Sequence, residues 1–296
     1  MSAWPSDGYV EWIADNTAYL SVVFSWHLGY AYQRAIWHRM FGRRVVAGGP
    51  AVYNNPNALD GVAQVGTTAN ALFRHNPRAT FTSRGCVRKC PFCAVPKIEG
   101  DLVELENWEP KPIVCDNNLL ATSRAHFDRV VDRLKGIAGV DFNQGLDARL
   151  LTPYHAQRLT ELDFHYIRLA WDNSAYEESF MRAWQILHDA GVPKDKISVY
   201  VLIGFRDTPE DALYRLTTIH GLGSKPFPMR YQPLDTRAKN SYVGPAWTHA
   251  ELQRYVRYWA NLRYFGAVPF DDFLNTMVPP SEDEGPGLEQ WLEEEE

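Results

Sequence analysis

The sequence predicts an α/β fold built on a parallel sheet, because strand-like runs alternate with helical segments and capping residues stand at the starts of several of those segments. From residue 78 onward, six short runs rich in β-branched and aromatic residues alternate with segments whose apolar residues recur at helical spacing. Strands separated by helices lie parallel when they share a sheet, because each helix returns the chain to the same edge. The six predicted strands are 79–83, 111–115, 140–144, 166–171, 197–204 and 227–234.

Boundary signals support the helices between these strands. Thr152 and Thr208 each precede a proline, which is typical of an N-cap followed by the first helical position. Thr248 and Glu251 have the spacing of a capping box. The predicted helices are 123–136, 152–162, 176–191, 208–223 and 248–266.

The first 77 residues predict a smaller unit. "TAYLSVVFSW" is typical of a strand, "YAYQRAIWHRMF" of a helix, and "RRVVAGGPAV" of a second strand ending in a glycine turn. Together they predict one βαβ unit. The predicted domains are therefore an N-terminal region (1–77), a larger α/β domain with a closing helix (78–280) and an acidic tail (281–296).

The net charge of −6 conceals an uneven distribution. The last sixteen residues, "SEDEGPGLEQWLEEEE", hold eight acidic residues and no basic ones. The rest of the chain has 30 basic and 28 acidic residues, a balance of +2. We expect residues 281–296 to be a disordered, solvated tail; the alternative is an intramolecular mimic of a polyanion.

Composition also narrows the expected location. Charges interrupt every apolar stretch before it reaches the roughly 18 residues of a membrane span, so we expect no membrane partner. "MSAWPSDGYVEW" lacks a basic region followed by an apolar run, so we expect no secretory signal. Four cysteines in 296 residues form no disulfide framework. These features predict a cytoplasmic protein whose clustered thiols serve metal or redox chemistry.

Three of the four cysteines lie within "RGCVRKCPFC", residues 84–93. Cys86, Cys90 and Cys93 have the spacing C-x3-C-x2-C. Three thiolates can hold three irons of a cubane cluster and leave the fourth iron open to a small molecule. Phe92 can shield such a cluster from water. Nearby basic residues favour thiolates and a more readily reduced cluster: Arg84, Arg88 and Lys89.

A structural zinc site is the alternative. Three thiolates on one loop need a fourth ligand to complete a tetrahedron, which Cys115 or a histidine would supply. Cys115 ends the predicted strand 111–115, where burial as a small hydrophobic residue is its expected role. A zinc site would make the chain a non-catalytic, zinc-stabilised binding protein.

The cysteine motif resembles the signature C-x3-C-x-(aromatic)-C of the radical S-adenosylmethionine (radical SAM) enzymes. The continuation "AVPKIEG", with Pro96 and Gly100, is similar to the branch that carries an N-terminal cobalamin-type domain. The resemblance implies that the three cysteines bind a [4Fe–4S] cluster whose open iron holds the amino and carboxylate groups of S-adenosylmethionine. It also implies a partial (β/α)6 barrel of the TIM type with a small N-terminal βαβ cap. The cysteine loop then follows the first strand, at the C-terminal mouth where barrel chemistry lies.

Polar residues at the strand ends are the remaining site candidates. In the family, the segment after the second strand contacts the methionine amino group, and Asp116, Asn117 and Asn118 look like the Asp-Asp-Asn type of the cobalamin-domain branch. Any one of them could be an ordinary cap or turn residue. Arg149 and Arg168 could pair bidentately with a carboxylate. The other cofactor-binding candidates are Phe92, Gln144, Asp172, Asn173, Gly204 and Arg230.

The resemblance implies a reaction as well. One electron from the reduced cluster cleaves S-adenosylmethionine into methionine and a 5′-deoxyadenosyl radical, which abstracts hydrogen from the substrate. A one-electron reductant such as flavodoxin or ferredoxin is then an expected partner. The protein binds, orients and excludes water. Whether the enzyme is an isomerase, lyase or transferase does not follow from the fold. Cys115 alone cannot hold a second cluster, which disfavours sulfur insertion.

Residues 1–77 resemble part of a cobalamin-binding domain, in which a strand likewise ends in Gly-Gly-Pro. The region is much shorter than that domain and lacks its Asp-x-His-x-x-Gly ligand pattern. His27 in "SWHLGY" does not supply the pattern, and a lone histidine is more often packed or hydrogen-bonded than a ligand. We expect a degenerate cap that does not bind cobalamin.

The last predicted helix interleaves arginines with aromatic residues, a pattern that suits phosphate contacts and base stacking. The alternative is a helix that closes the barrel with its aromatic residues inward and its arginines in water. With the basic residues near the cysteine loop, the pattern predicts modification of a nucleotide or of a base in DNA or RNA. A small metabolite or a peptide is the alternative substrate. The helix residues concerned are Arg254, Arg257, Arg263, Tyr255, Tyr258, Trp259 and Tyr264.

Overall fold

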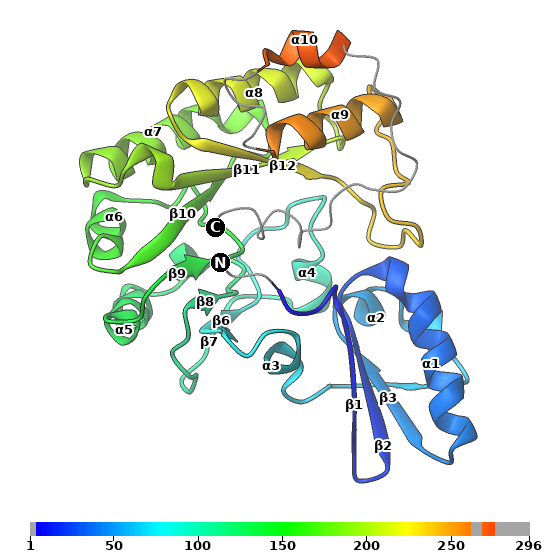
Figure 1. The fold of residues 1–296 in the computed structure, drawn as a ribbon. Coiled ribbons are helices and arrows are strands. Elements are labelled where there is room, and N and C mark those ends of the chain that lie inside the picture. The colour runs from blue at the N-terminus through cyan, green and yellow to red at the C-terminus, as the bar shows by residue number, and fades with distance from the viewer. Residues whose placement is uncertain (1–3, 262–267, 276–296) are drawn as a thin grey trace.

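The computed structural model describes residues 4–261 and 268–275, which form two main sheets (Figure 1). The smaller sheet has the strand order β1-β2-β3-β4, and the larger has the order β12-β11-β10-β9-β8-β5. Every pair of neighbouring strands in the larger sheet is parallel. The predicted α/β class and the six-stranded parallel sheet are therefore confirmed. Its strands are β5 (Ala79–Thr80), β8 (Ile113–Val114), β9 (Val140–Phe142), β10 (Phe164–Ala170), β11 (Ile197–Ile203) and β12 (Lys225–Arg230).

The predicted strand 79–83 is divided in the structure. β5 ends at Thr80 because Thr82 turns away to bond Asp116, whose carboxylate accepts the Thr82 backbone N–H at 2.6 Å. The chain then forms β6 (Ser83–Arg84), which pairs antiparallel with β7 (Val103–Glu104) outside the large sheet.

The helices between the strands begin where the sequence predicts. Thr152 and Thr208 accept N-terminal backbone N–H groups with their hydroxyls, and Thr248 and Glu251 form the predicted capping box. α9 ends at Trp259, earlier than predicted, and Arg263 and Tyr264 lie outside the described residues. The tail 281–296 also lies outside them. The helices are α5 (Arg124–Leu134), α6 (Pro153–Leu159), α7 (Glu177–Asp189), α8 (Pro209–Gly221), α9 (His249–Trp259) and α10 (Phe270–Asn275).

The two faces of the large sheet have different surroundings, as β11 shows. Val199, Val201 and Ile203 are fully buried in the main core, which includes apolar residues of α7 and α8. Tyr200 and Leu202 alternate with them on the other face and are only partly buried. Because strand side chains alternate between faces, one face of the sheet packs on helices and the other remains open to a cavity.

The N-terminal unit contains the predicted βαβ arrangement, because β2 pairs parallel with β3 across α1. β1 was not among the predicted strands; it joins β2 through a hairpin at Asp15 and Asn16. Both turn residues have positive φ (46° and 56°), as tight hairpin turns require. The elements are β1 (Tyr9–Ala14), β2 (Thr17–Val22), α1 (Leu28–Met40), β3 (Arg44–Gly48), α2 (Pro50–Asn54), β4 (Gln64–Val65) and α3 (Ala71–His75).

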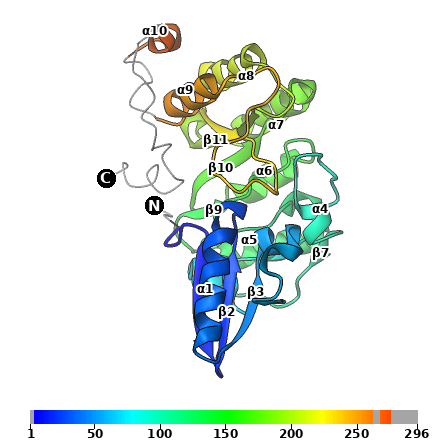
Figure 2. The ribbon, with the colours of Figure 1, turned by 90° about the vertical axis from the view of Figure 1, so that its right-hand side faces the viewer.

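Hydrogen bonds to the segment after β12 join the N-terminal unit to the larger one. Asn54 and Asn55 donate to the Leu234 carbonyl, each at 3.1 Å, and the Ser25 hydroxyl donates to the Thr236 carbonyl. Figure 2 shows the N-terminal sheet at one end of the molecule and α8 and α9 at the other. No helix within residues 4–261 and 268–275 is long and apolar enough to cross a membrane.

Candidate functional site

The three clustered cysteines lie in one loop that a short hairpin closes. β6 and β7 form the hairpin, and the chain between them carries Cys86, Cys90 and Cys93, followed by the short helix α4 (Val95–Ile98). The Cys93 backbone N–H donates to the Cys90 carbonyl at 3.1 Å, which makes a turn between these two residues. The loop thus follows the first strand of the large sheet, as predicted.

Glu99 holds the base of this loop together. Its carboxylate accepts bonds from Arg84 (2.7 Å), from the Gly85 backbone N–H (2.9 Å) and from Asn117 (2.7 Å). Gly85 has φ +72°, and a Cβ there would lie 2.0 Å from the Asp101 carbonyl oxygen. Only glycine therefore fits where the chain enters the cysteine loop.

The clustered thiols are partly exposed and lie within electrostatic reach of one another. Burial raises the pKa of Cys90, while the nearby Arg149 opposes that change. Burial also raises the pKa of Cys93, the Val95 backbone N–H opposes it, and Cys90 and Cys86 add to it. A metal group that binds these sulfurs would replace their protons and relieve their mutual repulsion.

Cys86 also receives two N–H···S contacts. The Arg88 backbone N–H lies 3.3 Å from its sulfur, and the Asn118 side-chain amide lies 3.6 Å away. Such donors stabilise negative charge on a ligating sulfur and tune a bound metal group. Asn118 Oδ1 is buried without a hydrogen-bond partner among the described residues.

Cys115 has a different environment. It is 4% exposed in the small core next to β5 and β8, as expected of a buried hydrophobic residue. Burial, supported by the Asp116 charge, raises the pKa of Cys115 to about 12, so its thiol stays protonated near neutral pH.

Asp147 links the cysteine loop to the segment after β9. Its carboxylate accepts Arg88 (3.1 Å), Asn118 (3.2 Å) and both donors of Arg149 (2.6 and 3.1 Å). Burial alone would raise the pKa of Asp147, but the Arg149 and Arg88 guanidinium groups hold it below its usual value. The predicted bidentate pairing of Arg149 is thus made within the protein, and Arg168 pairs in the same way with Asp141 (2.6 and 2.9 Å).

A cavity of about 1690 Å³ lies between the cysteine loop, the open face of the large sheet, α9 and the N-terminal unit. Two strand residues of its wall, Tyr200 and Leu202, belong to the sheet face that the helices leave uncovered. The predicted cluster and cofactor residues that line it are Phe92, Cys93, Asn117, Gln144, Asp172 and Arg230, and Cys115, Arg254 and Arg257 line it as well.

Asp172 is a partly buried acid in the cavity wall. Burial raises the pKa of Asp172 to about 6, and the positive charges of Arg215 and Arg149 limit the rise. Its charge also acts on Cys90 and Cys93, which places it near the cysteine loop. A carboxyl group that exchanges a proton near neutral pH can serve as a proton donor or acceptor.

Other sequence candidates have local structural roles. Asp116 is 4% exposed, and its carboxylate accepts Thr82 and Ser83. Asn173 caps a short helical turn by accepting the Ala175 N–H at 2.8 Å. A Cβ at Gly204 would lie 2.9 Å from Leu252 of α9, so this glycine permits close helix packing. Asp116, Asn118, Asn173 and Gly204 are not among the cavity-lining residues.

A row of aromatic rings, which the sequence analysis did not identify, joins the cysteine loop to β12. Phe92 contacts Phe205 at a ring-centroid distance of 5.7 Å, and Phe205 contacts Tyr231 at 4.6 Å. Tyr242 continues the row at 5.2 Å from Tyr231. These residues are far apart in sequence, so only the positions of Phe205 and Tyr231 just after strands could have indicated them.

The N-terminal unit also contributes cavity residues that the sequence analysis did not assign. Phe24 and Trp26, stacked at 4.5 Å, line the cavity together with Asn54. The Gly-Gly-Pro turn was the feature of the sequence that could have indicated these residues, because it places α2 beside the cavity. Gly49 has φ +97°, and a Cβ there would lie 2.5 Å from the Val22 carbonyl. His27 lies 4.0 Å from Asp7 and also lines the cavity.

Within the described part of the chain, no three His, Cys, Asp or Glu side chains are grouped closely enough to hold one metal ion. A single zinc ion needs its ligands around one point. A cubane cluster needs only that each thiolate reach a different iron. The three partly exposed thiols lie on one loop, Cys86 receives two N–H donors, and Cys93 opens into the cavity.

No protein-family model matches this chain, and no curated protein matches it.

Proposed function

We propose that this protein is a radical SAM enzyme whose [4Fe–4S] cluster is held by Cys86, Cys90 and Cys93. The observation that carries the proposal is the C-x3-C-x2-C loop, which follows the first strand of a six-stranded parallel sheet and opens at Cys93 into a large cavity. Cys115 also lines the cavity, but it stays outside the ligand set because its side chain packs in a separate apolar core with Ala79 and Ile113.

The strand order supports a partial (β/α)6 barrel. The six strands of the large sheet lie side by side in the order in which they occur along the chain, from β5 to β12. That order is the one a singly wound barrel has, and it places the residues after each strand at the same end of the sheet. The N-terminal unit then covers the open side of the cavity.

When bound, the cluster and S-adenosylmethionine supply a 5′-deoxyadenosyl radical that abstracts hydrogen from the substrate. The protein positions the loop through Glu99 and Asp147, which hold its two sides. Phe92 and Phe205 exclude water beside Cys93. Asn117, Gln144 and Asp172 present polar groups to the cavity, and Asp172 can hold or release a proton there.

A nucleotide or a nucleic-acid base is the proposed substrate class. Arg254 and Arg257 of α9 line the cavity, while Tyr255, Tyr258 and Trp259 pack into the core. The helix therefore packs its aromatic residues into the core, as expected of a barrel-closing helix. It also lines the cavity with two arginines, of which Arg254 is partly buried and Arg257 is exposed. A one-electron reductant such as flavodoxin or ferredoxin would supply the electron.

The test is anaerobic reconstitution of the full chain with iron and sulfide. We expect about four irons per chain and visible absorption at about 400 nm from thiolate–iron bonds. Dithionite and S-adenosylmethionine should then give 5′-deoxyadenosine slowly even without substrate. A fully loaded, reduced protein that cleaves no S-adenosylmethionine would contradict the proposal, and a colourless protein with one bound zinc would favour the zinc-stabilised alternative.

We also propose that the N-terminal unit binds no cobalamin. The test is purification in the presence of hydroxocobalamin, followed by desalting and a visible spectrum. Stoichiometric retained corrin would overturn this part of the proposal without affecting the cluster assignment.

A further inference from the structure

Four cations line the wall of the cavity formed by β12, the segment after it and α9. They are Arg230, Lys239, Arg254 and Arg257. Within residues 4–261 and 268–275, none of the four has a carboxylate partner at ion-pair distance. The acidic residues that line the same cavity are Asp7, Glu99 and Asp172, and Glu99 already pairs with Arg84.

Arg230 and Arg254 are partly buried, whereas Lys239 and Arg257 are exposed. Arg230 Nη2 donates to the Tyr242 carbonyl at 2.8 Å and lies 3.3 Å from His249 Nδ1. Its Nε is buried and has no hydrogen-bond partner among the described residues. Burial lowers the pKa of Arg230 to about 10, so the group keeps its charge at neutral pH. A partly buried guanidinium with a buried, unused N–H donor is unfavourable alone, and an anion placed against it would accept that hydrogen bond.

One face of α9 lines the cavity. Ala250, Gln253, Arg254, Arg257 and Ala260 recur at intervals of three and four residues and all line the cavity. Small residues at both ends of this face leave space beside the two arginines. Gln253 Oε1 and, on the facing segment, Gln232 Oε1 are buried without partners among the described residues.

Aromatic side chains complete this end of the cavity. Tyr200, Phe227 and Tyr231 line it, and Tyr231 begins the row of rings that leads through Phe205 to Phe92. Cations beside aromatic faces and unpaired amide oxygens match the three parts of a nucleotide: phosphate, base face and base edge. A lone carboxylate would neutralise one of the four cations, whereas phosphates can neutralise several.

We propose that Arg230, Lys239, Arg254 and Arg257 form a phosphate-binding wall for a nucleotide, free or within a strand, whose base lies toward the cysteine loop. Phosphate binding by this wall requires no cluster. The role of the bound nucleotide as the substrate rests on the proposed function.

The experiment measures binding to the full chain carrying Cys86→Ala, Cys90→Ala and Cys93→Ala, so that no cluster forms. The probes are inorganic pyrophosphate, AMP, and fluorescent 12-nucleotide single strands of DNA and RNA across a salt series. Arg230→Gln should weaken binding about tenfold or more, as expected for loss of a charged hydrogen bond. Arg254→Gln with Arg257→Gln should lower the salt slope for a single strand by about 1.4.

Arg182→Gln is the matched control, because it removes an exposed arginine of the outer helix α7 that does not line the cavity. Arg230→Lys separates loss of charge from loss of shape, and the melting temperature of each variant tests folding. Tight AMP binding identifies a free nucleotide, and strand binding without AMP binding identifies a nucleic acid. Absence of binding to every probe, or equal losses in Arg182→Gln and Arg230→Gln, would overturn the inference.

The two proposals fail separately. Phosphate binding without any iron cluster in the reconstituted native chain leaves the wall intact and removes the radical SAM assignment. Cluster formation and 5′-deoxyadenosine production without phosphate binding would support the radical SAM assignment and remove the phosphate-binding wall.

Discussion

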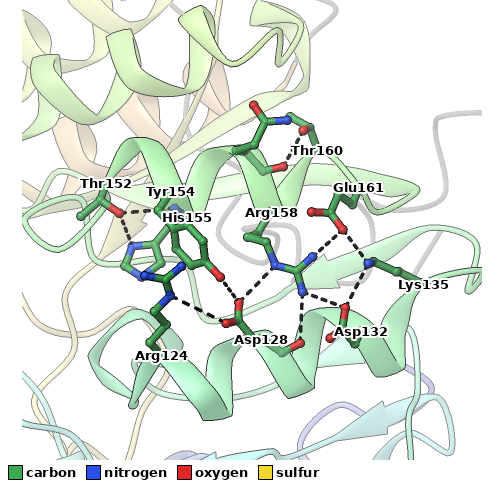
Figure 3. A network of polar contacts seen from close by, with 11 residues as sticks. Arg124, Asp128, Asp132, Lys135, Thr152, Tyr154, His155, Arg158, Thr160 and Glu161 are labelled. Carbon is green, nitrogen blue, oxygen red and sulfur yellow. Dashed lines mark hydrogen bonds and ion pairs between the residues drawn. The ribbon is translucent and has the colours of Figure 1, made fainter.

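The α5–α6 surface and the cavity wall are both rich in arginine, yet their charges are arranged in opposite ways. On the surface, Arg158 pairs with Asp128 (3.1 Å), Asp132 (2.8 Å) and Glu161, and Lys135 bridges Asp132 (3.0 Å) and Glu161 (2.6 Å) (Figure 3). Within this network each drawn cation has a carboxylate partner. Its groups are already satisfied by the fold.

The cavity wall has cations without such partners among the described residues. The Arg230 side chain bonds only a carbonyl and lies near a histidine, while Arg254 and Arg257 line the cavity with no carboxylate at ion-pair distance among those residues. The number of charges therefore does not distinguish a structural cluster from a binding site. The distinguishing property is whether the fold itself supplies the opposite charge.

The cysteines show the same contrast and give the largest expected effect. Cys90→Ala should abolish [4Fe–4S] assembly, because three thiolates are needed to hold three irons. Cys115→Ala should keep the full iron content, because its thiol is buried in a separate core. Iron and sulfide are counted after anaerobic reconstitution. If Cys115→Ala loses as much iron as Cys90→Ala, the ligand assignment is wrong.

The next largest effect is on the free energy of unfolding, and it should differ between Arg168 and Arg230. Arg168→Gln should destabilise the fold by about 3–5 kcal/mol, because it leaves the buried Asp141 carboxylate unpaired. Arg230→Gln should destabilise far less, since it leaves no carboxylate unpaired, although it weakens phosphate binding. Urea unfolding followed by circular dichroism measures both. Adding Asp141→Asn to Arg168→Gln should recover part of the loss; equal destabilisation by the two single variants would remove the distinction between satisfied and available cations.

A smaller effect is expected at the outer network. Arg158→Gln should lower the melting temperature by no more than about 3 °C, because solvent screens ion pairs at the surface. It should leave nucleotide binding unchanged. Differential scanning calorimetry measures the melting temperature, and the binding assay measures the nucleotide affinity. A large loss of affinity in this variant would show that binding depends on general charge and not on the cavity wall.

The smallest expected effect concerns the acidic segment 281–296. Its deletion removes eight negative charges and should tighten single-strand binding about two- to threefold at low salt, where charges act over longer distances. The gain should vanish near 0.5 M salt. A chain in which Ser and Gly replace those residues controls for length. Equal affinity of the intact and shortened chains at low salt would contradict this expectation.

Local signals in the sequence were sufficient for much of the fold. Thr248 and Glu251 predicted the start of α9, because a capping box depends on residues three positions apart. The division of strand 79–83 was missed, since it depends on a bond from Thr82 to Asp116, which is distant in sequence.

The site was harder to predict for the same reason. The spacing of Cys86, Cys90 and Cys93 is a local pattern and was visible directly. The partner of Arg168 is Asp141, on a neighbouring strand, and no local pattern indicates that pairing. Helical spacing separates Tyr255 from Arg254, but only the tertiary arrangement places Arg254 in a cavity and not in bulk water.

The bonds between the N-terminal unit and the segment after β12 have a consequence for evolution of the chain. Ser25, Asn54 and Asn55 donate with their side chains, but the acceptors at Leu234 and Thr236 are backbone carbonyls. Every amino acid has a backbone carbonyl, so substitutions at 234 and 236 can accumulate while the junction persists. The three donor positions lack this freedom. Positions 234 and 236, which follow Arg230 in the chain, can therefore change while the N-terminal unit stays attached. In homologous chains, sequence variation should be greater at these two positions than at Ser25, Asn54 and Asn55.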